Sequence, residues 1–539
     1  MDKELQEILG LLKSVSAQLE TVDSRMTNVE SRLAAIEKKT SSDPSQTIPI
    51  KLISRALQLT EPEDKDVLLC LDFGTARSKA FATNGSDEIM VDIAVGQQAG
   101  SAIVHSVLSC VYIGDDGRIY FGETAAAKSE LAVDRGARKR IDSFKAMITN
   151  ASPGTDLRAT PYGHDYNPTA IRLSEGDILS LYLAYFTDLA GQELTGRHGL
   201  SRYVRRRFTT PVFSEQHQQW ASSVLRRHYT EAVLIADQFS GRWQDGIDVS
   251  EAKQVLQSAA NQCAAVEYLM ESSEVEPVAA FGSRFRYYEP RDVRRQLVSI
   301  VDIGAGTTDF ATFAVLEQPE RGVNMFLIPG SVHAVRKAGN EVDRILREYI
   351  LNDLNKRHAG QDENIIARIK ADLSLRQRSF KEQLFRDGRI EYTLADDTKG
   401  EVTLDSFLED PAVKQFAAEL QIEFEHSLRG IDPSWIREGA HGQITVIMTG
   451  GSANLPMVKS LGNRQVTSLS VALTCVPGTV LPRWVSRDYP ELSDEFPQLA
   501  VAIGGSSREL PIFSEKQFSS FDGLSDQGKW VLPVASRGQ

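Results

Sequence analysis

Apolar residues recur every three or four positions near the start of the chain. One heptad position holds Leu5, Leu12, Leu19, Met26 and Leu33, and the position three residues later holds Ile8, Val15, Val22, Val29 and Ile36. A sustained 3.5-residue period makes helices supercoil around partners, whereas an isolated helix with one apolar seam gains little by itself. We therefore expect residues 1–37 to form a coiled coil. A single amphipathic helix packed on its own globular domain is the alternative.

The same segment indicates how copies of the chain would assemble. Arg25 of one helix is spaced to pair with Glu30 of a parallel helix across the seam, and Arg32 is spaced in the same way to pair with Glu37. Leucine at the first seam position with β-branched residues at the second favours trimers or tetramers over dimers. We expect self-association through residues 5–36 as a parallel trimer or tetramer.

A Ser/Pro/Asp-rich stretch then breaks the helical period, and residues 38–66 are interpreted as a linker with a short docking element. From residue 67 onward, short apolar strands alternate with amphipathic helices, which is typical of an α/β fold. Helix starts are expected at Ser174 with Asp177 and at Ser214, and helices are expected over 363–385 and 405–428.

Two distant segments repeat one pattern of an apolar strand, an aspartate, a glycine-bearing turn with threonine, and a second apolar strand. They are LDFGTARSKAFA at 71–82 and VDIGAGTTDFATFA at 301–314. Glycine lets successive backbone N–H groups turn toward an anion without a Cβ in the way. A carboxylate beside a polyphosphate is useful only if a hard cation such as Mg²⁺ lies between them. The pair predicts a nucleotide with magnesium, although either turn alone could be an ordinary hairpin.

A third segment, ITVIMTGGSANLPMVKSL at 444–461, reads as a buried strand, a glycine turn and a helix that begins near Pro456 and runs through Leu461. A helix N-terminus after two glycines suits a phosphate or a nucleoside. A plain strand-to-helix turn is the alternative.

In this order and spacing, the three segments resemble the phosphate-1, phosphate-2 and adenosine motifs of the actin, sugar-kinase and heat-shock ATPase superfamily. The nearest resemblance is to the nucleotide-binding domain of the seventy-kilodalton heat-shock (DnaK-type) chaperones. Intervening stretches support it, namely DDGRIYFGETAAAKSE at 115–130, SFKAMI at 143–148, RFTTPVFSEQHQQW at 207–220, VEPVAAFG at 275–282 and KAGNEVDRIL at 337–346.

The resemblance implies a two-lobed actin-like ATPase fold made of duplicated ribonuclease H-like domains. It places lobe I at 67–270 and lobe II at 271–510, with the chain returning to lobe I near the end and a short tail at 511–539. The chaperones' peptide-binding domain needs more residues than follow 510, so we expect it to be absent.

The resemblance also assigns roles to residues. Lys145 matches the family's catalytic lysine. Glu276 matches the family's glutamate that links the nucleotide site to the coupling between the lobes. Asp72 and Asp302 would hold hydrated Mg²⁺. The catalytic set is Asp72, Lys145, Glu276, Asp302 and Thr307. The residues expected to bind ATP or ADP are Gly74, Thr75, Ala76, Gly304, Ala305, Gly306, Thr307, Gly339, Lys381, Gly450, Gly451 and Ser452.

Some positions depart from the family pattern. Arg77 adds a cation to the first loop, which predicts slower or altered turnover. Arg378, Glu382 and Phe385 replace the family's adenine-contacting residues around Lys381, so adenine preference is less secure than phosphate binding.

Composition changes this picture little. A net charge of −13 argues against broad nucleic-acid binding. The four cysteines form no CxxC pair, which indicates neither a zinc site nor a disulfide framework. No stretch has the eighteen or so consecutive apolar residues of a membrane span, and we expect a cytoplasmic protein without a membrane partner.

Three functions fit the motifs. We favour a Mg-dependent, chaperone-like ATPase switch, oligomerised by the N-terminal helix, whose lobe closure signals to a protein client or co-chaperone. An actin-like filament-forming ATPase is the first alternative. A small-molecule kinase of the same superfamily is the second.

Overall fold

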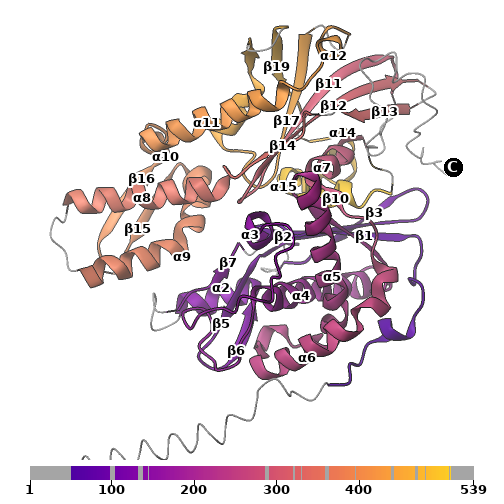
Figure 1. The fold of residues 1–539 in the computed structure, drawn as a ribbon. Coiled ribbons are helices and arrows are strands. Elements are labelled where there is room, and N and C mark those ends of the chain that lie inside the picture. Colours follow the sequence, from indigo (N-terminus) through magenta and orange to yellow (C-terminus); the bar gives the residue numbers. More distant parts are fainter. Residues whose placement is uncertain are drawn as a thin grey trace, which may run out of the picture. The chain divides into compact units, whose positions relative to one another are not determined.

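The computed structural model describes residues 50–96, 103–131, 138–143, 145–285, 290–319, 322–328, 330–357, 363–394, 396–438, 442–467, 471–479, 481–508 and 510. The predicted coiled coil, residues 38–49 of the predicted linker and the tail at 511–539 lie outside these ranges. From Lys51 onward the chain forms one compact unit. It has a mixed α/β architecture with several sheets (Figure 1). No helix among the described residues is both long and apolar enough to cross a membrane.

The first sheet is built around a fully buried central strand, β1. Its order is β10 (Glu274–Val275), β8 (Arg205–Thr210), β1 (Val67–Asp72), β2 (Arg77–Asn84) and β3 (Ile89–Ile93), with β4 (Ser106–Leu108) also paired to β2. β1 is antiparallel to β2 and parallel to β8. Every residue of β1 is buried, which explains why this strand reads as a continuous apolar run rather than an alternating one.

The second sheet repeats the order and the strand directions of the first. It consists of β13 (Gly322–Leu327), β12 (Thr308–Gln318), β11 (Arg294–Ile303), β17 (Gln443–Thr449), β19 (Leu473–Pro477) and β18 (Arg464–Val466), with β14 (His333–Val335) paired to β12. β11 is antiparallel to β12 and parallel to β17, as β1 is to β2 and β8. Thus β1–β2–β3 with β8 and β10 corresponds to β11–β12–β13 with β17 and β19.

Two smaller sheets and the helices complete the described fold. The smaller sheets pair β7 (Ile141–Asp142), β5 (Cys110–Ile113), β6 (Arg118–Phe121) and β9 (Ile247–Asp248), and β15 (Arg389–Thr393) with β16 (Lys399–Thr403). The helices are α2 (Gly122–Leu131), α3 (Lys145–Asn150), α4 (Glu175–Gly196), α5 (Glu215–Phe239), α6 (Val249–Gln262), α7 (Glu276–Phe285), α8 (Gly339–Arg357), α9 (Glu363–Asp387), α10 (Leu404–Leu408), α11 (Pro411–Leu428), α12 (Pro433–Glu438), α13 (Pro456–Lys459), α14 (Arg483–Asp488) and α15 (Phe496–Gly505).

Several expected helix starts are confirmed. Ser174 and Asp177 form a reciprocal capping box at the start of α4, and α5 begins directly after Ser214. The single helix expected over 405–428 is wrong, because the chain forms α10 and α11 instead. Pro411 has no N–H to continue the first helix, and the Asp410 side chain caps the second.

Helices α7 and α15 pack against each other and against strands of both large sheets. One core cluster contains Phe281 of α7, Ile503 of α15, Phe81 of β2 and Phe313 of β12. The end of α15 is also tied to the first sheet, because Thr83 donates a hydrogen bond to the Ser506 carbonyl, at 2.6 Å. Residues near the end of the described chain therefore contribute to the packing of the first sheet.

Candidate functional site

The two predicted glycine turns lie at equivalent ends of the two large sheets. Asp72 ends β1, and its carboxylate accepts a hydrogen bond from Thr209 of the parallel neighbour β8, at 3.1 Å. Asp302 near the end of β11 accepts from Thr449 of its parallel neighbour β17, at 3.3 Å. Both carboxylates are buried. The sheet repeat thus presents the same aspartate and threonine pair twice.

The charge across each hairpin distinguishes the two turns. The residue opposite Asp72 on β2 is Lys79, and its ammonium lies 3.2 Å from the Asp72 carboxylate. The residue opposite Asp302 on β12 is another acid, Asp309. Burial, followed by the charges of Glu276, Asp309 and Asp72, raises the pKa of Asp302 well above its usual range.

The turns themselves contact each other. A Cβ added to Gly306 would lie 2.9 Å from the Thr75 hydroxyl oxygen and 3.2 Å from its methyl carbon. Only a residue without a side chain allows this approach without a shift. Two segments that are far apart in the sequence, both predicted to bind phosphates, are therefore neighbours in space.

A buried ion pair joins α3 to α7 beside these turns. Lys145, the first residue of α3, donates to the carboxylate of Glu276, the first residue of α7. Burial would lower the pKa of Lys145, but the carboxylates of Glu276, Asp72 and Asp309 raise it. For Glu276, burial raises the pKa, and the neighbouring Asp72 adds to this against the Lys145 charge. The lysine is held protonated in an acidic surrounding.

Asp309 belongs to the same buried group. Its carboxylate accepts a hydrogen bond from the backbone N–H of Val212, at 2.9 Å, in the loop between β8 and α5. Burial, followed by the Glu276 charge, raises the pKa of Asp309 to about 7. This places an acid that titrates near neutral pH between the two sheets.

The third predicted segment lies against the second turn. Gly450 has a φ of +88°, and a Cβ there would lie 2.4 Å from the Ile303 carbonyl, so this position requires glycine. Ser452 donates from its hydroxyl to the Gly304 carbonyl, at 3.2 Å. The helix after the turn begins at Pro456 as predicted, but the α-helix ends at Lys459 and continues only as a 3-10 turn to Gly462.

The remaining predicted contacts gather at the start of α8. Lys381 of α9 donates to the Gly339 carbonyl at 3.1 Å and pairs with Asp343 at 2.8 Å. A Cβ on Gly339 would lie 2.6 Å from the Ser452 hydroxyl and 3.2 Å from the Gly304 carbonyl. The backbone of Ala305 accepts from Asn340 at 2.7 Å. Gly451 differs from this group, since no atom lies within 4 Å of a Cβ built there.

Two of the departures from the motif pattern have visible partners. Arg77 points to Ser106, at 3.5 Å, and to Glu123, at 3.8 Å, so its charge is shared with groups outside the turn. Arg378 donates to the Asn340 side chain at 3.4 Å. Glu382 is exposed, and Phe385 packs against the core of the second sheet.

Sequence reasoning missed Lys79, Thr209 and Thr449. Lys79 and Asp309 each follow their aspartate by seven residues, and this spacing places them opposite it in the hairpin. That spacing could have identified Lys79. The threonines come from strands that only the sheet order makes adjacent.

Four acids and two lysines make up the described cluster: Asp72, Glu276, Asp302, Asp309, Lys79 and Lys145. With all of them ionised, this cluster has an excess of negative charge. No group of three or more His, Cys, Asp or Glu side chains within the described ranges is arranged to ligate a metal directly.

Comparison with protein-family models and with curated proteins gives no match to this chain.

Proposed function

We propose that this protein is a Mg-dependent ATP-binding and hydrolysing switch with a two-lobed actin-like fold. The observation that carries the proposal is the meeting of the two glycine turns, where Gly306 lies against Thr75 and a buried aspartate precedes each turn. The matching strand order of the two large sheets supports the fold, because duplicated ribonuclease H-like domains would produce such a repeat.

The acidic cluster fits a nucleotide-bound cation better than a bare metal site. Among the described residues, too few acidic side chains are grouped to bind a metal ion directly. Asp72 and Asp302, from the two turns, would instead hold Mg²⁺ through its bound water molecules. The ion would neutralise the excess carboxylate charge and the phosphates together. The upward pKa shift of Asp302 supports this, since a cation beside it would relieve the cost of burying its charge.

Phosphoryl transfer to water requires mainly alignment and neutralisation of spreading negative charge. Lys145 is protonated and buried beside Asp72, so it would stabilise that charge, while Glu276 fixes the direction of its ammonium. Asp309 would accept the proton of a water held near its carboxylate. The backbone N–H groups of the turns at Gly74–Ala76 and Gly304–Thr307 would contact the phosphates.

The switch follows from where Glu276 lies. It begins α7, and α7 packs against α15 and strands of both sheets. A change at the Lys145–Glu276 pair would therefore reach the elements that join the two lobes. We propose that lobe closure signals to a protein client or co-chaperone, and that the N-terminal segment gathers several copies of the switch.

The test measures Mg·ATP affinity by isothermal titration and phosphate release by a steady-state assay. The double variant Asp72→Asn/Asp302→Asn keeps side-chain size and removes both charges. We expect it to lose Mg-dependent affinity by at least about tenfold and to lose turnover. Asp494→Asn, at an exposed position, is the matched control. Unchanged magnesium dependence in the double variant would refute the proposal.

Adenine preference is tested separately by comparing ATP with GTP. Lys381 is committed to Gly339 and Asp343, and Arg378 to Asn340, so few charged groups are left to select the base. We expect ATP and GTP to differ less than tenfold in affinity. A larger preference would show that the base is read by other residues.

A further inference from the structure

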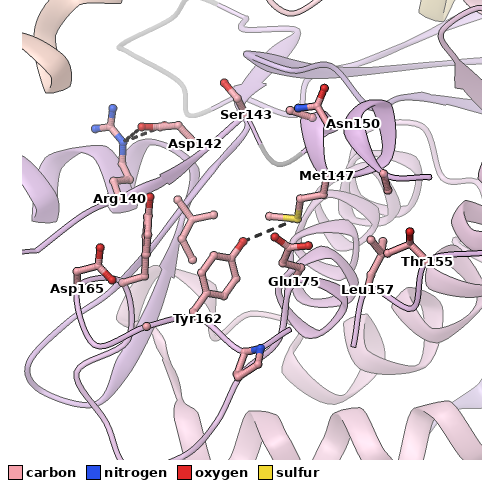
Figure 2. Close-up of a pocket in the computed structure, with 16 residues that line it drawn as sticks. Arg140, Asp142, Ser143, Met147, Asn150, Thr155, Leu157, Tyr162, Asp165 and Glu175 are labelled. Atoms are coloured by element: carbon pink, nitrogen blue, oxygen red, sulfur yellow. Dashed lines mark hydrogen bonds and ion pairs between the residues drawn. The ribbon is translucent and has the colours of Figure 1, made fainter. Parts of the chain in front are cut away.

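A cavity of about 780 Å³ lies beside α3 and the start of α4. Its walls come from β7, α3, the segment at 155–166 and the start of α4 (Figure 2). Volumes of this order are typical of small-molecule sites. None of the residues predicted to bind nucleotide lines it. A ligand in this cavity would therefore be bound by residues other than those of the proposed ATPase site.

The backbone fixes two residues of the wall next to each other. The Tyr162 N–H donates to the Leu173 carbonyl at 2.9 Å, and the Glu175 N–H donates to the Thr160 carbonyl at 3.3 Å. These bonds hold Tyr162 and Glu175 on adjacent short segments, and the Ser174 capping box fixes the first turn of α4. Figure 2 shows both side chains directed into the cavity.

The acidic side chains of the cavity wall are paired with basic side chains, except for Glu175. Arg140 binds Asp142, with both distances at 3.0 Å, and Lys139 binds Asp165 at 2.7 Å. Among the described residues, Glu175 has no hydrogen-bond or ion-pair partner for its carboxylate. Burial raises the pKa of Glu175. Burial also raises the pKa of Tyr162, and the Glu175 charge adds to that shift. The wall thus holds a negative charge that a ligand could satisfy.

The rest of the wall suits the body of an organic cation. The Tyr162 ring lies 5.4 Å from the Tyr166 ring, and Tyr166 already has the Lys139 ammonium over its face. Met147, Leu157 and Pro161 add apolar surface. Aromatic faces attract ammonium and guanidinium groups, and this attraction strengthens where water is partly excluded.

We propose that this cavity binds an organic cation, in which Glu175 pairs with an ammonium or guanidinium group and Tyr162 packs against the apolar body that carries it. The cation could belong to a free amine or to a basic side chain of a peptide. Both sources share this chemistry, and the experiment separates them.

The test uses isothermal titration with tryptamine and its neutral counterpart tryptophol, in which a hydroxyl replaces the ammonium. We expect the full-length protein to bind tryptamine at least about tenfold more tightly than tryptophol. Glu175→Gln should abolish that preference. Glu215→Gln is the matched control, because Glu215 is the first residue of the next helix, α5, and does not line the cavity.

A peptide arm identifies the source of the cation. Acetyl-Trp-Lys-Trp-amide is compared with the same peptide acetylated at the lysine Nζ. Preference for the unmodified peptide over tryptamine supports a polypeptide ligand, and binding of tryptamine alone supports a free amine. If Glu175→Gln fails to fold by circular dichroism, Tyr162→Leu replaces it and should weaken tryptamine binding severalfold. Equal binding of tryptamine and tryptophol to the unmodified protein, or no saturable binding of any cation, overturns the proposal.

Discussion

Cross-strand partners give the two glycine turns opposite electrostatic characters. Asp72 faces Lys79, whereas Asp302 faces Asp309, although the two hairpins share their register. The second turn therefore depends on distant cations or on a ligand to balance its charge. Because Asp309 lies opposite Asp302, its protonation would remove one of two facing negative charges.

Replacement of Asp309 by asparagine should stabilise the protein at high pH. The pKa of Asp309 is raised on folding to about 7, so the folded state binds its proton more tightly. Its contribution to stability is complete below about pH 4 and is lost as the pH rises to about 7. We expect Asp309→Asn to gain up to about 4 kcal/mol over the parent at pH 8 and little at pH 4.5.

Urea denaturation at both pH values measures this difference. Asp494→Asn, at an exposed position, serves as the control and should show no such pH dependence. A gain of equal size at both pH values would show that Asp309 is not the titrating group.

The Lys145–Glu276 pair predicts a non-additive result. Lys145→Met leaves the Glu276 carboxylate buried without its cation, which costs about 3–5 kcal/mol. The double variant Lys145→Met/Glu276→Gln removes both charges and should recover most of that stability. Neither variant should hydrolyse ATP under the proposed mechanism. Denaturant midpoints of Lys145→Met, Glu276→Gln and the double variant complete the cycle, and additive losses would contradict the pairing.

Among secondary-structure elements, the contact between α7 and α15 is the tightest glycine-dependent packing in the described chain. A Cβ on Gly504 would lie 1.7 Å from the Ala279 carbonyl oxygen and 2.7 Å from the Ser283 nitrogen. Both are backbone atoms of a helix and cannot rotate away. The two helices can therefore approach this closely only with glycine at this position.

We expect Gly504→Ala to destabilise the protein by at least about 2 kcal/mol, since overpacking forces backbone shifts. Gly196→Ala, at the end of α4, is the matched control because a Cβ there meets no atom within 4 Å. Thermal melting compares the two. An unaffected melting temperature in Gly504→Ala would show that α15 moves without cost.

The elements also show what the sequence could predict. Local signals were sufficient where one segment carries the information, as at Ser174, Asp177 and the turn before Pro456. The break at Pro411 was readable in principle from the Asp410–Pro411 pair but was masked by the surrounding helical period. Lys79 and Asp309 needed hairpin register, and Thr209 and Thr449 needed the order of parallel strands. The sequence did not indicate the cavity beside Glu175, because its walls come from β7, α3, the segment at 155–166 and the start of α4, which only the fold brings together.

For the molecule as a whole, the repeated strand order concerns the fold of one chain, whereas the N-terminal heptads predict how several chains assemble. The compact unit from Lys51 onward contains both large sheets and the proposed site. Residues 51–66, which the sequence indicated as part of a linker, belong to this unit, and the Ala56 carbonyl accepts a hydrogen bond from the Tyr268 hydroxyl at 2.9 Å. Self-association through residues 5–36 remains a prediction from sequence.

Substitutions on the predicted seam should dissociate the assembly without unfolding the compact unit. Leu19 and Val22 occupy the two seam positions, whereas Ser24 lies on the opposite side of the heptad. A charge in a coiled-coil seam must be buried without a partner, so Leu19→Asp/Val22→Asp should convert a trimer or tetramer to monomers. Ser24→Asp should leave the assembly intact. Mass photometry of the three proteins, together with a form lacking residues 1–40, reads the subunit number directly, and a monomer in every case would contradict the coiled coil.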